Sequence, residues 1–176
     1  DFWAPSRVIP WTINEFPYWS FLFADLHPHM IGIPVALLFL ALVLTLIKDS
    51  DVYGRGLWPW GAALLGLFAL MLGTLASINL WELPTYALLG LAALLVSQYR
   101  HDGRVDWALT ISAGFVYMLG AYLAFAPFFR TFTSVGAGGI GFVREPDPTG
   151  LWLLIWGFLL FSTVSWLFYT TSRTAR

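Results

Sequence analysis

The sequence predicts an all-α fold: a polytopic transmembrane helix bundle with about five spans and a short interfacial or re-entrant helix near the N-terminus. Hydrophobic residues make up 59% of the chain, whereas charged residues make up only 11%. Soluble domains are roughly 45–50% apolar and about 25% charged, so most of this surface is expected to face lipid. Several apolar windows also approach the ~20 helical residues that cross a bilayer.

Each predicted span is an apolar window long enough to be considered for one membrane crossing. The windows are residues 29–47, 57–78, 84–98, 106–128 and 150–170. The third window is short at about 15 residues, so it needs little tilt or help from its flanking residues. The aromatic stretch 17–27 is too short to cross, and it runs into Pro28, a favourable first-turn residue for the first span.

The windows together predict a single membrane domain over residues 1–176. In the second window Ala69, Gly73 and Ser77 recur every four residues, which predicts a close helix contact on that face. The chain starts at Asp1 and shows no signal-peptide pattern. We therefore expect it to be an internal or partial segment of a longer protein.

Basic residues are distributed unevenly between the two sides of the predicted bundle. One side carries Lys48, Arg55, Arg100, Arg104, Arg173 and Arg176, and the other carries Arg7, Arg130 and Arg144. Because positively charged loops stay in the cytoplasm, the first side is predicted to be cytoplasmic and the second extracytoplasmic. The expected location is the plasma membrane, as a multi-pass protein.

Composition also excludes several classes of partner and chemistry. The formal net charge is −1 and no block of Lys or Arg occurs, so the sequence indicates no nucleic-acid partner. Cysteine is absent, which removes disulfides, thiolate metal ligands and cysteine nucleophiles. Any chemistry must therefore come from carboxylates, imidazoles and the other polar side chains.

The first polar constellation is TINEFPYWSFLFADLHPH, residues 12–29, with Glu15, Asp25, His27 and His29 beside or inside an apolar stretch. Ionisable groups are costly there and usually face a wet cavity or the protein interior. Carboxylate and imidazole together suit acid–base transfer, and Asp25 with His29 are candidate ligands of a divalent cation. The structural alternative is that these residues cap the start of the first span.

The second constellation is SINLWELPTY, residues 77–86, at the predicted outer junction of the second and third spans. Pro84 opens a helix, so Asn79 and Glu82 lie around an N-terminus whose amides and dipole favour anions. An ordinary tight turn, with Asn79 and Glu82 as caps, is the alternative.

The third constellation is the predicted outer loop of residues 128–147, in which glycines lie between Arg130 and Arg144. Residues 136–141 match G-x-G-x-x-G, but no predicted strand precedes them, so a dinucleotide site is rejected. A glycine loop between two arginines suits closure over an anionic group, and a plain connector is the alternative.

Taken together, the motifs resemble the YYY-domain family of large multi-spanning membrane proteins of uncharacterised function. The resemblance rests on NEFPYWSFLFADLHPH at 14–29, NLWELPTY at 79–86, and APFFR with GAGGIG at 126–141. Glu82 departs from the Asp of that family's motif, which puts the geometry at this position in doubt. The family in turn is similar to membrane glycosyltransferases of the GT-C architecture, which use lipid-linked phosphosugars as donors.

The leading functional hypothesis is glycosyl transfer from a polyprenyl-phosphate sugar at the outer face of the membrane. Glu15 or Asp25 is expected to be the catalytic base or to hold a divalent cation. The expected substrate-binding residues are His27, His29, Asn79, Glu82, Arg130 and Arg144. Membrane lipids and a lipid-linked phosphosugar are the expected partners.

Two other classes remain open on the sequence. The aromatic richness and the small-residue face also fit a non-catalytic structural or assembly subunit that binds other membrane subunits. A transporter using Glu15, Asp25 and His29 as a relay ranks third, because the predicted spans contain hardly any ionisable residue at mid-depth.

Overall fold

The computed structural model describes residues 6–10, 12, 14, 17–48, 61–133, 142 and 145–174. In these residues the regular structure is helical: α1 (Pro17–Phe23), α2 (Pro28–Lys48), α4 (Ala62–Ile78), α5 (Glu82–Asp102), α6 (Trp107–Ala124), α7 (Ala126–Thr131) and α8 (Thr149–Thr174). The chain divides into two compact units, one of Ser20–Ser134 and one of Asp1–Trp19 with Val135–Arg176. The all-helical prediction is confirmed for the described part of the chain.

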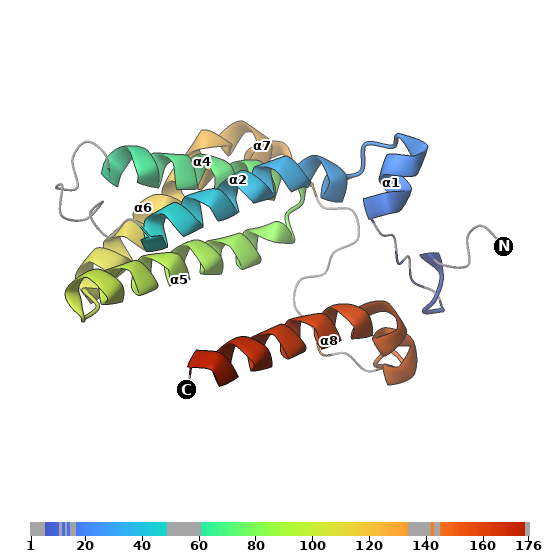
Figure 1. Cartoon of the computed structure of the whole chain (residues 1–176). Helices are drawn as coiled ribbons and strands as arrows, with labels where there is room; N and C mark the ends of the chain where they lie inside the picture. The colour runs from blue at the N-terminus through green and yellow to red at the C-terminus, as the bar shows by residue number, and fades with distance from the viewer. Residues whose placement is uncertain are drawn as a thin grey trace. The chain divides into compact units, whose positions relative to one another are not determined.

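The larger unit is a bundle of α2, α4, α5 and α6 (Figure 1). Helix α2 packs on α4 and α5, and α4 also packs on α6. Short turns at 79–81 and 103–106 join α4 to α5 and α5 to α6, so consecutive helices run in opposite directions. One end of the bundle therefore carries the start of α2, the end of α4, the start of α5 and the end of α6.

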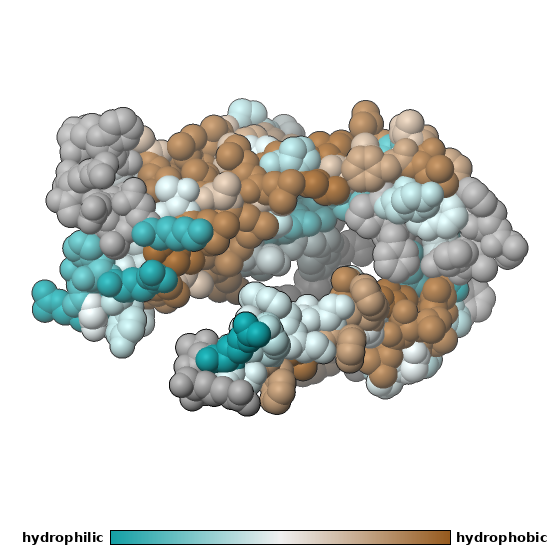
Figure 2. All heavy atoms as spheres, in the orientation of Figure 1, coloured by the Kyte–Doolittle hydropathy of each residue, from teal (hydrophilic) through white to brown (hydrophobic). Residues whose placement is uncertain are grey.

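Within the part of the chain that the structure describes, three helices are long and apolar enough to cross a membrane, namely Pro28–Lys48, Trp107–Ala124 and Thr149–Arg173. A fourth, Ala62–Ile78, is apolar but has only 17 residues. Large hydrophobic side chains cover much of the outer surface of these helices (Figure 2). The structure is thus that of a membrane protein with several apolar helices.

Helix α5 is longer than the apolar window that predicted it. It runs for 21 residues from Glu82 to Asp102, against the predicted span of 84–98. The additional C-terminal turn carries Arg100 and His101, polar residues that lower the mean hydropathy without ending a helix. The helix ends at Gly103, which adopts the left-handed conformation with φ 65° that glycine tolerates.

The fourth predicted span, 106–128, is interrupted near its end. Helix α6 stops at Ala124, Phe125 leaves the helical conformation with ψ 20°, and α7 begins at Ala126. Pro127 explains the break, because its ring has no N–H and clashes with the preceding helical turn. Helix α7 is held against α6 by Tyr122, whose ring stacks on that of Phe129 at 5.8 Å between centroids.

The core of the bundle is a chain of edge-to-face aromatic contacts. Phe39 is fully buried, and its ring centroid lies 5.2 Å from that of Phe68 and 5.1 Å from that of Tyr86. Phe68 in turn meets Tyr117 at 6.2 Å. The Tyr117 hydroxyl donates a hydrogen bond to the backbone carbonyl of Tyr86 over 3.0 Å, which leaves no unpaired polar group at this point of the core.

The predicted small-residue face of the second span is confirmed at two of its positions. A Cβ atom on Gly73 would lie 2.9 Å from the carbonyl oxygen of Ala121, and the ring of Phe125 covers the same glycine. The Cβ of Ala69 would lie 3.1 Å from a Cβ on Gly120. Small residues on α4 and α6 therefore let the two backbones approach each other closely.

Helix α8 belongs to the other compact unit and differs in character. Hydrophobic side chains are exposed around its whole circumference, and none of its membrane-length window is buried. A helix that is apolar on every side is stable only in lipid or among other helices. Its 25-residue apolar length fits a membrane span.

We expect Gly73→Ala to destabilise the bundle by about 1–3 kcal/mol, because the added methyl group meets a backbone oxygen that cannot move away alone. Gly66→Ala in the same helix is the matched control, since nothing lies within 4 Å of that position. Alanine favours helix over glycine, so the control should be more stable by up to about 1 kcal/mol. Unfolding in mixed micelles, followed by circular dichroism, measures both; equal stability of the two variants would contradict the close contact.

Candidate functional site

The segment between α1 and α2 reverses the chain and brings polar side chains together. The amide of Asp25 donates to the carbonyl of Ser20 over 3.0 Å, and the amide of Ala24 donates to that of Phe21 over 3.3 Å. These two bonds form the Schellman motif that commonly ends a helix. Ala24 adopts φ 52°, the left-handed conformation normally taken by glycine in this motif.

Asp25 and His27 are in contact directly after this turn. Nδ1 of His27 lies 3.0 Å from Oδ2 of Asp25, and the Asp25 side chain is 61% exposed. The His27 carbonyl accepts hydrogen bonds from the amides of Met30 and Ile31 and so starts α2. As predicted, Pro28 is the first residue of this helix, where its missing N–H costs nothing.

His29 is held by a residue that the sequence reasoning did not select. Its Nε2 atom lies 2.8 Å from the hydroxyl oxygen of Ser20, whose side chain is buried. The rings of His27 and His29 lie 5.3 Å apart between centroids. Ser20 is a small polar residue within the aromatic run PYWSFLF, and this could have marked it in the sequence. Its contact with His29, nine residues away, depends on the chain reversal at Ala24.

The structure brings the histidines to different partners. The Asp25 carboxylate contacts His27, while His29 contacts Ser20. Among the described residues, no three His, Asp or Glu side chains gather where they could hold a metal ion. A divalent cation on Asp25 and His29 remains a prediction.

Asn79 and Glu82 form the turn between α4 and α5. The Asn79 amide donates to the carbonyl of Leu75, and its side-chain oxygen accepts a 3.3 Å bond from the amide of Trp81. Its own carbonyl accepts from the amide of Glu82, which is half-buried in the first turn of α5. Asn79 thus stabilises the turn, which agrees with the alternative of a tight turn capped by this residue. The carboxylate of Glu82 lies near a helix N-terminus.

These residues lie at one end of the bundle. A Cβ on Gly32, one turn beyond His29, would lie 4.0 Å from Cγ2 of Ile78, which places the start of α2 beside the end of α4. Arg130 is exposed on α7, which follows the end of α6 at the same end. The described members of all three polar constellations therefore share this end of the bundle.

Three other predicted features lie outside the described residues: Glu15, Arg144 and the glycine loop 136–141. Their predicted roles stay predictions. The end of the bundle that carries Asp25 and Glu82 is thus defined by residues 20–29, 79–82 and 126–131.

Apolar helices that bury few polar groups, with charged side chains at the ends of the bundle, define a helical membrane protein. The chain belongs to the family described as "Uncharacterized membrane protein (DUF2298)", which matches residues 2–176. The expectation of an uncharacterised family of membrane proteins is confirmed at that level. No curated protein and no solved structure matches the chain.

We expect substitutions at Ala24 to act in opposite directions on the turn that presents Asp25. Glycine removes the cost of the left-handed conformation, about 1–2 kcal/mol for an L-residue, and valine raises it. Hydrogen–deuterium exchange of the amides of Ala24 and Asp25 reports the effect, with slower exchange in Ala24→Gly and faster exchange in Ala24→Val. Identical exchange in both variants would argue against the Schellman turn.

Proposed function

We propose that this protein transfers a glycosyl group from a polyprenyl-phosphate sugar to an acceptor hydroxyl at the outer face of the membrane. The observation that carries the proposal is the contact of the exposed Asp25 carboxylate with His27 at the end of an apolar bundle. An exposed carboxylate in contact with an imidazole is suited to accepting a proton from a substrate. The resemblance of the motifs to GT-C transferases supplies the reaction class.

In the proposed reaction Asp25 accepts the proton of the acceptor hydroxyl. The acceptor oxygen then forms a bond to the anomeric carbon of the sugar, and the bond from that carbon to the phosphate oxygen breaks. The electron pair leaves with the polyprenyl phosphate. His27 orients the Asp25 carboxylate through the 3.0 Å contact, and general-base assistance of this kind contributes about 10²–10⁴-fold to a rate.

The remaining residues are proposed to handle the phosphate. His29, held by Ser20, faces the donor phosphate, and Arg130 supplies positive charge from α7. Glu82 shapes the wall of the site at the start of α5, with Asn79 fixing the turn before it. Glu15 as an additional base and Arg144 as a second phosphate contact complete the predicted set.

We propose that α2, α4, α5, α6 and α8 are the five spans. Helix α5 has 21 residues, which reach ~32 Å at ~1.5 Å per residue, as much as a hydrocarbon core. It packs against α2, which is apolar and long enough to span, and α4 packs against both α2 and α6. The uneven distribution of basic residues supports an extracytoplasmic site.

Asp25→Asn is expected to lower sugar transfer by about 10²–10⁴-fold, because the amide cannot accept the acceptor proton. The assay follows transfer from a pool of polyprenyl-phosphate sugars in membranes that contain the full-length protein. The matched control is Asp102→Asn, which changes another His–Asp pair, 2.7 Å between His101 Nδ1 and Asp102 Oδ1, at the opposite end of the bundle.

Activity of Asp25→Asn equal to that of the control would remove the catalytic role of this carboxylate. If Asp25 instead holds a divalent cation with His29, chelation should abolish the wild-type activity and excess cation should restore it. Base catalysis by Asp25 alone predicts that chelation has no effect.

Single cysteines should report the proposed sidedness directly, because the chain contains no cysteine of its own. Trp81, in the α4–α5 turn, and Arg104, in the α5–α6 turn, are both exposed. A membrane-impermeant maleimide added outside intact cells should label Trp81→Cys at once and Arg104→Cys only after permeabilisation. The reverse pattern would place the Asp25 site in the cytoplasm, and labelling of both would mean that α5 does not span.

Helix α8 favours a second candidate function, that of a structural or assembly subunit. Exposed apolar side chains around its whole length offer a surface for helices of other membrane proteins. Purification in a gentle detergent distinguishes the two functions. Recovery of this polypeptide alone would count against the subunit function.

A further inference from the structure

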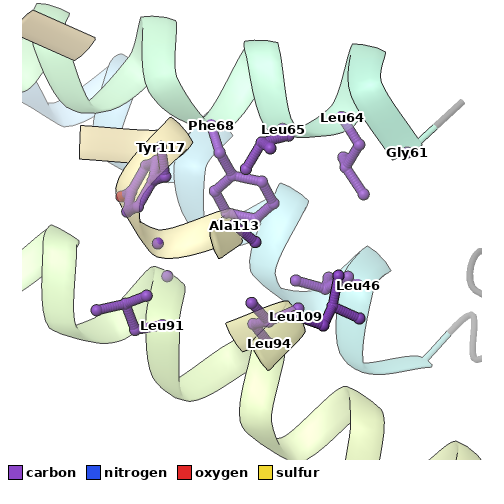
Figure 3. Close-up of a pocket in the computed structure, with 12 residues that line it drawn as sticks. Leu46, Gly61, Leu64, Leu65, Phe68, Leu91, Leu94, Leu109, Ala113 and Tyr117 are labelled. Atoms are coloured by element: carbon purple, nitrogen blue, oxygen red, sulfur yellow. The ribbon is translucent and has the colours of Figure 1, made fainter. Parts of the chain in front are cut away.

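An apolar hollow lies between α2, α4, α5 and α6, at the end of the bundle opposite to Asp25. Its volume is about 80 Å³, and it is lined chiefly by Leu46, Leu64, Leu65, Leu94, Leu109 and Ala113. Figure 3 shows leucine side chains from all four helices around this space. Leu46 is near the last turn of α2 and Leu109 is in the first turn of α6, so the hollow is close to the helix ends.

Water is a poor occupant of this hollow. A buried water needs two to four polar partners, although the volume far exceeds the about 10–15 Å³ that one water requires. The hydroxyl group in the lining belongs to Tyr117, and it already donates to the carbonyl of Tyr86. A hydrocarbon chain breaks no hydrogen bond on entering such a space from the bilayer, and it gains contacts with the leucines.

The same end of the bundle carries a set of basic side chains. Lys48 ends α2, Arg100 lies in the last turn of α5, and Arg104 lies in the turn to α6. All three are exposed, and none forms an ion pair with another described residue. Basic residues near a membrane surface attract anionic headgroups.

The described carboxylates near these basic residues have local partners. Asp102 accepts from His101 over 2.7 Å, and Asp106 caps α6 by accepting from the amide of Leu109 over 3.0 Å. Asp49 and Asp51 lie outside the described residues. Among the residues that the structure describes, no carboxylate therefore pairs with Lys48, Arg100 or Arg104.

We propose that this hollow binds an acyl chain of an anionic membrane phospholipid, whose phosphate is held by Lys48, Arg100 and Arg104. The leucines supply the apolar contact and the basic residues select the headgroup. This site is independent of the proposed glycosyl transfer, because it lies at the other end of the bundle and needs only the membrane location.

Photolabelling tests the site in the full-length protein. The protein is reconstituted in vesicles of phosphatidylcholine and phosphatidylglycerol that contain a trace of phosphatidylglycerol with a diazirine on one acyl chain. After irradiation, mass spectrometry should locate adducts on the hollow around Leu64, Leu94 and Ala113. Ile111, exposed on the outside of α6, reports labelling by bulk lipid. Unlabelled phosphatidylglycerol should displace the adducts in the hollow more strongly than those on Ile111.

Two sets of variants separate the acyl chain from the headgroup. Ala113→Phe should fill the hollow and remove its adducts, whereas Ala108→Phe, on the exposed face of the same helix, should keep them. Lys48→Gln, Arg100→Gln and Arg104→Gln change only exposed side chains. Each should reduce the preference for phosphatidylglycerol over phosphatidylcholine about fivefold, the factor that one basic residue contributes at an anionic surface.

Three outcomes would overturn the proposal. Adducts in the hollow no stronger than on Ile111 would mean that no lipid is held there. Equal displacement by phosphatidylcholine would show that the site does not select an anionic headgroup. A photoreactive amino acid can also be placed at position 113. If it crosslinks to another protein segment and not to lipid, the occupant of the hollow is protein.

Discussion

Close approach between helices is the constraint on which this structure depends, because lipid provides no hydrophobic force to bring helices together. The bundle achieves this close approach by placing glycine and other small residues at the helix contacts. Buried polar groups at these contacts are paired in hydrogen bonds. A Cβ on Gly90 would lie 2.9 Å from the hydroxyl oxygen of Tyr117, so the glycine makes room for the hydrogen bond to Tyr86. Ser97 likewise donates to the carbonyl of Leu46 over 2.7 Å. Such contacts fix how closely the helices pack and in which register, and hence which side chains meet at each end.

The two ends of the bundle are built in different ways. At one end, the side chains of Ser20, Asp25, His27 and His29 are organised by short-range contacts within residues 20–29, and the packing of α2 connects them to the other helices. At the opposite end, the space between four helices is apolar and the charges stay on the exposed helix ends.

Patterns in the sequence predicted the membrane class, the start of α2 at Pro28 and the contact face at Ala69 and Gly73, because each follows from local composition or from a single residue. The contact of Ser20 with His29 could not be predicted, since it depends on Ala24 adopting a backbone conformation that alanine rarely takes. The apolar window 84–98 was shorter than α5, because hydropathy indicates which residues can contact lipid and does not indicate where a helix ends. The hydrogen bonds of Asn79 show its role in the turn between α4 and α5, and its role in substrate binding stays a prediction.

The side chain of Gln98 has a consequence for how the protein reaches the membrane. It is buried, its Nε2 donates to the hydroxyl of Thr110, and its Oε1 accepts from the backbone amide of Asp106. Both partners belong to the following turn and helix, so this amide stays unsatisfied until α6 lies beside α5. With α5 and α6 as neighbouring spans, as proposed above, the two helices are expected to leave the translocon as a paired hairpin, with α5 retained until its partner has emerged from the ribosome.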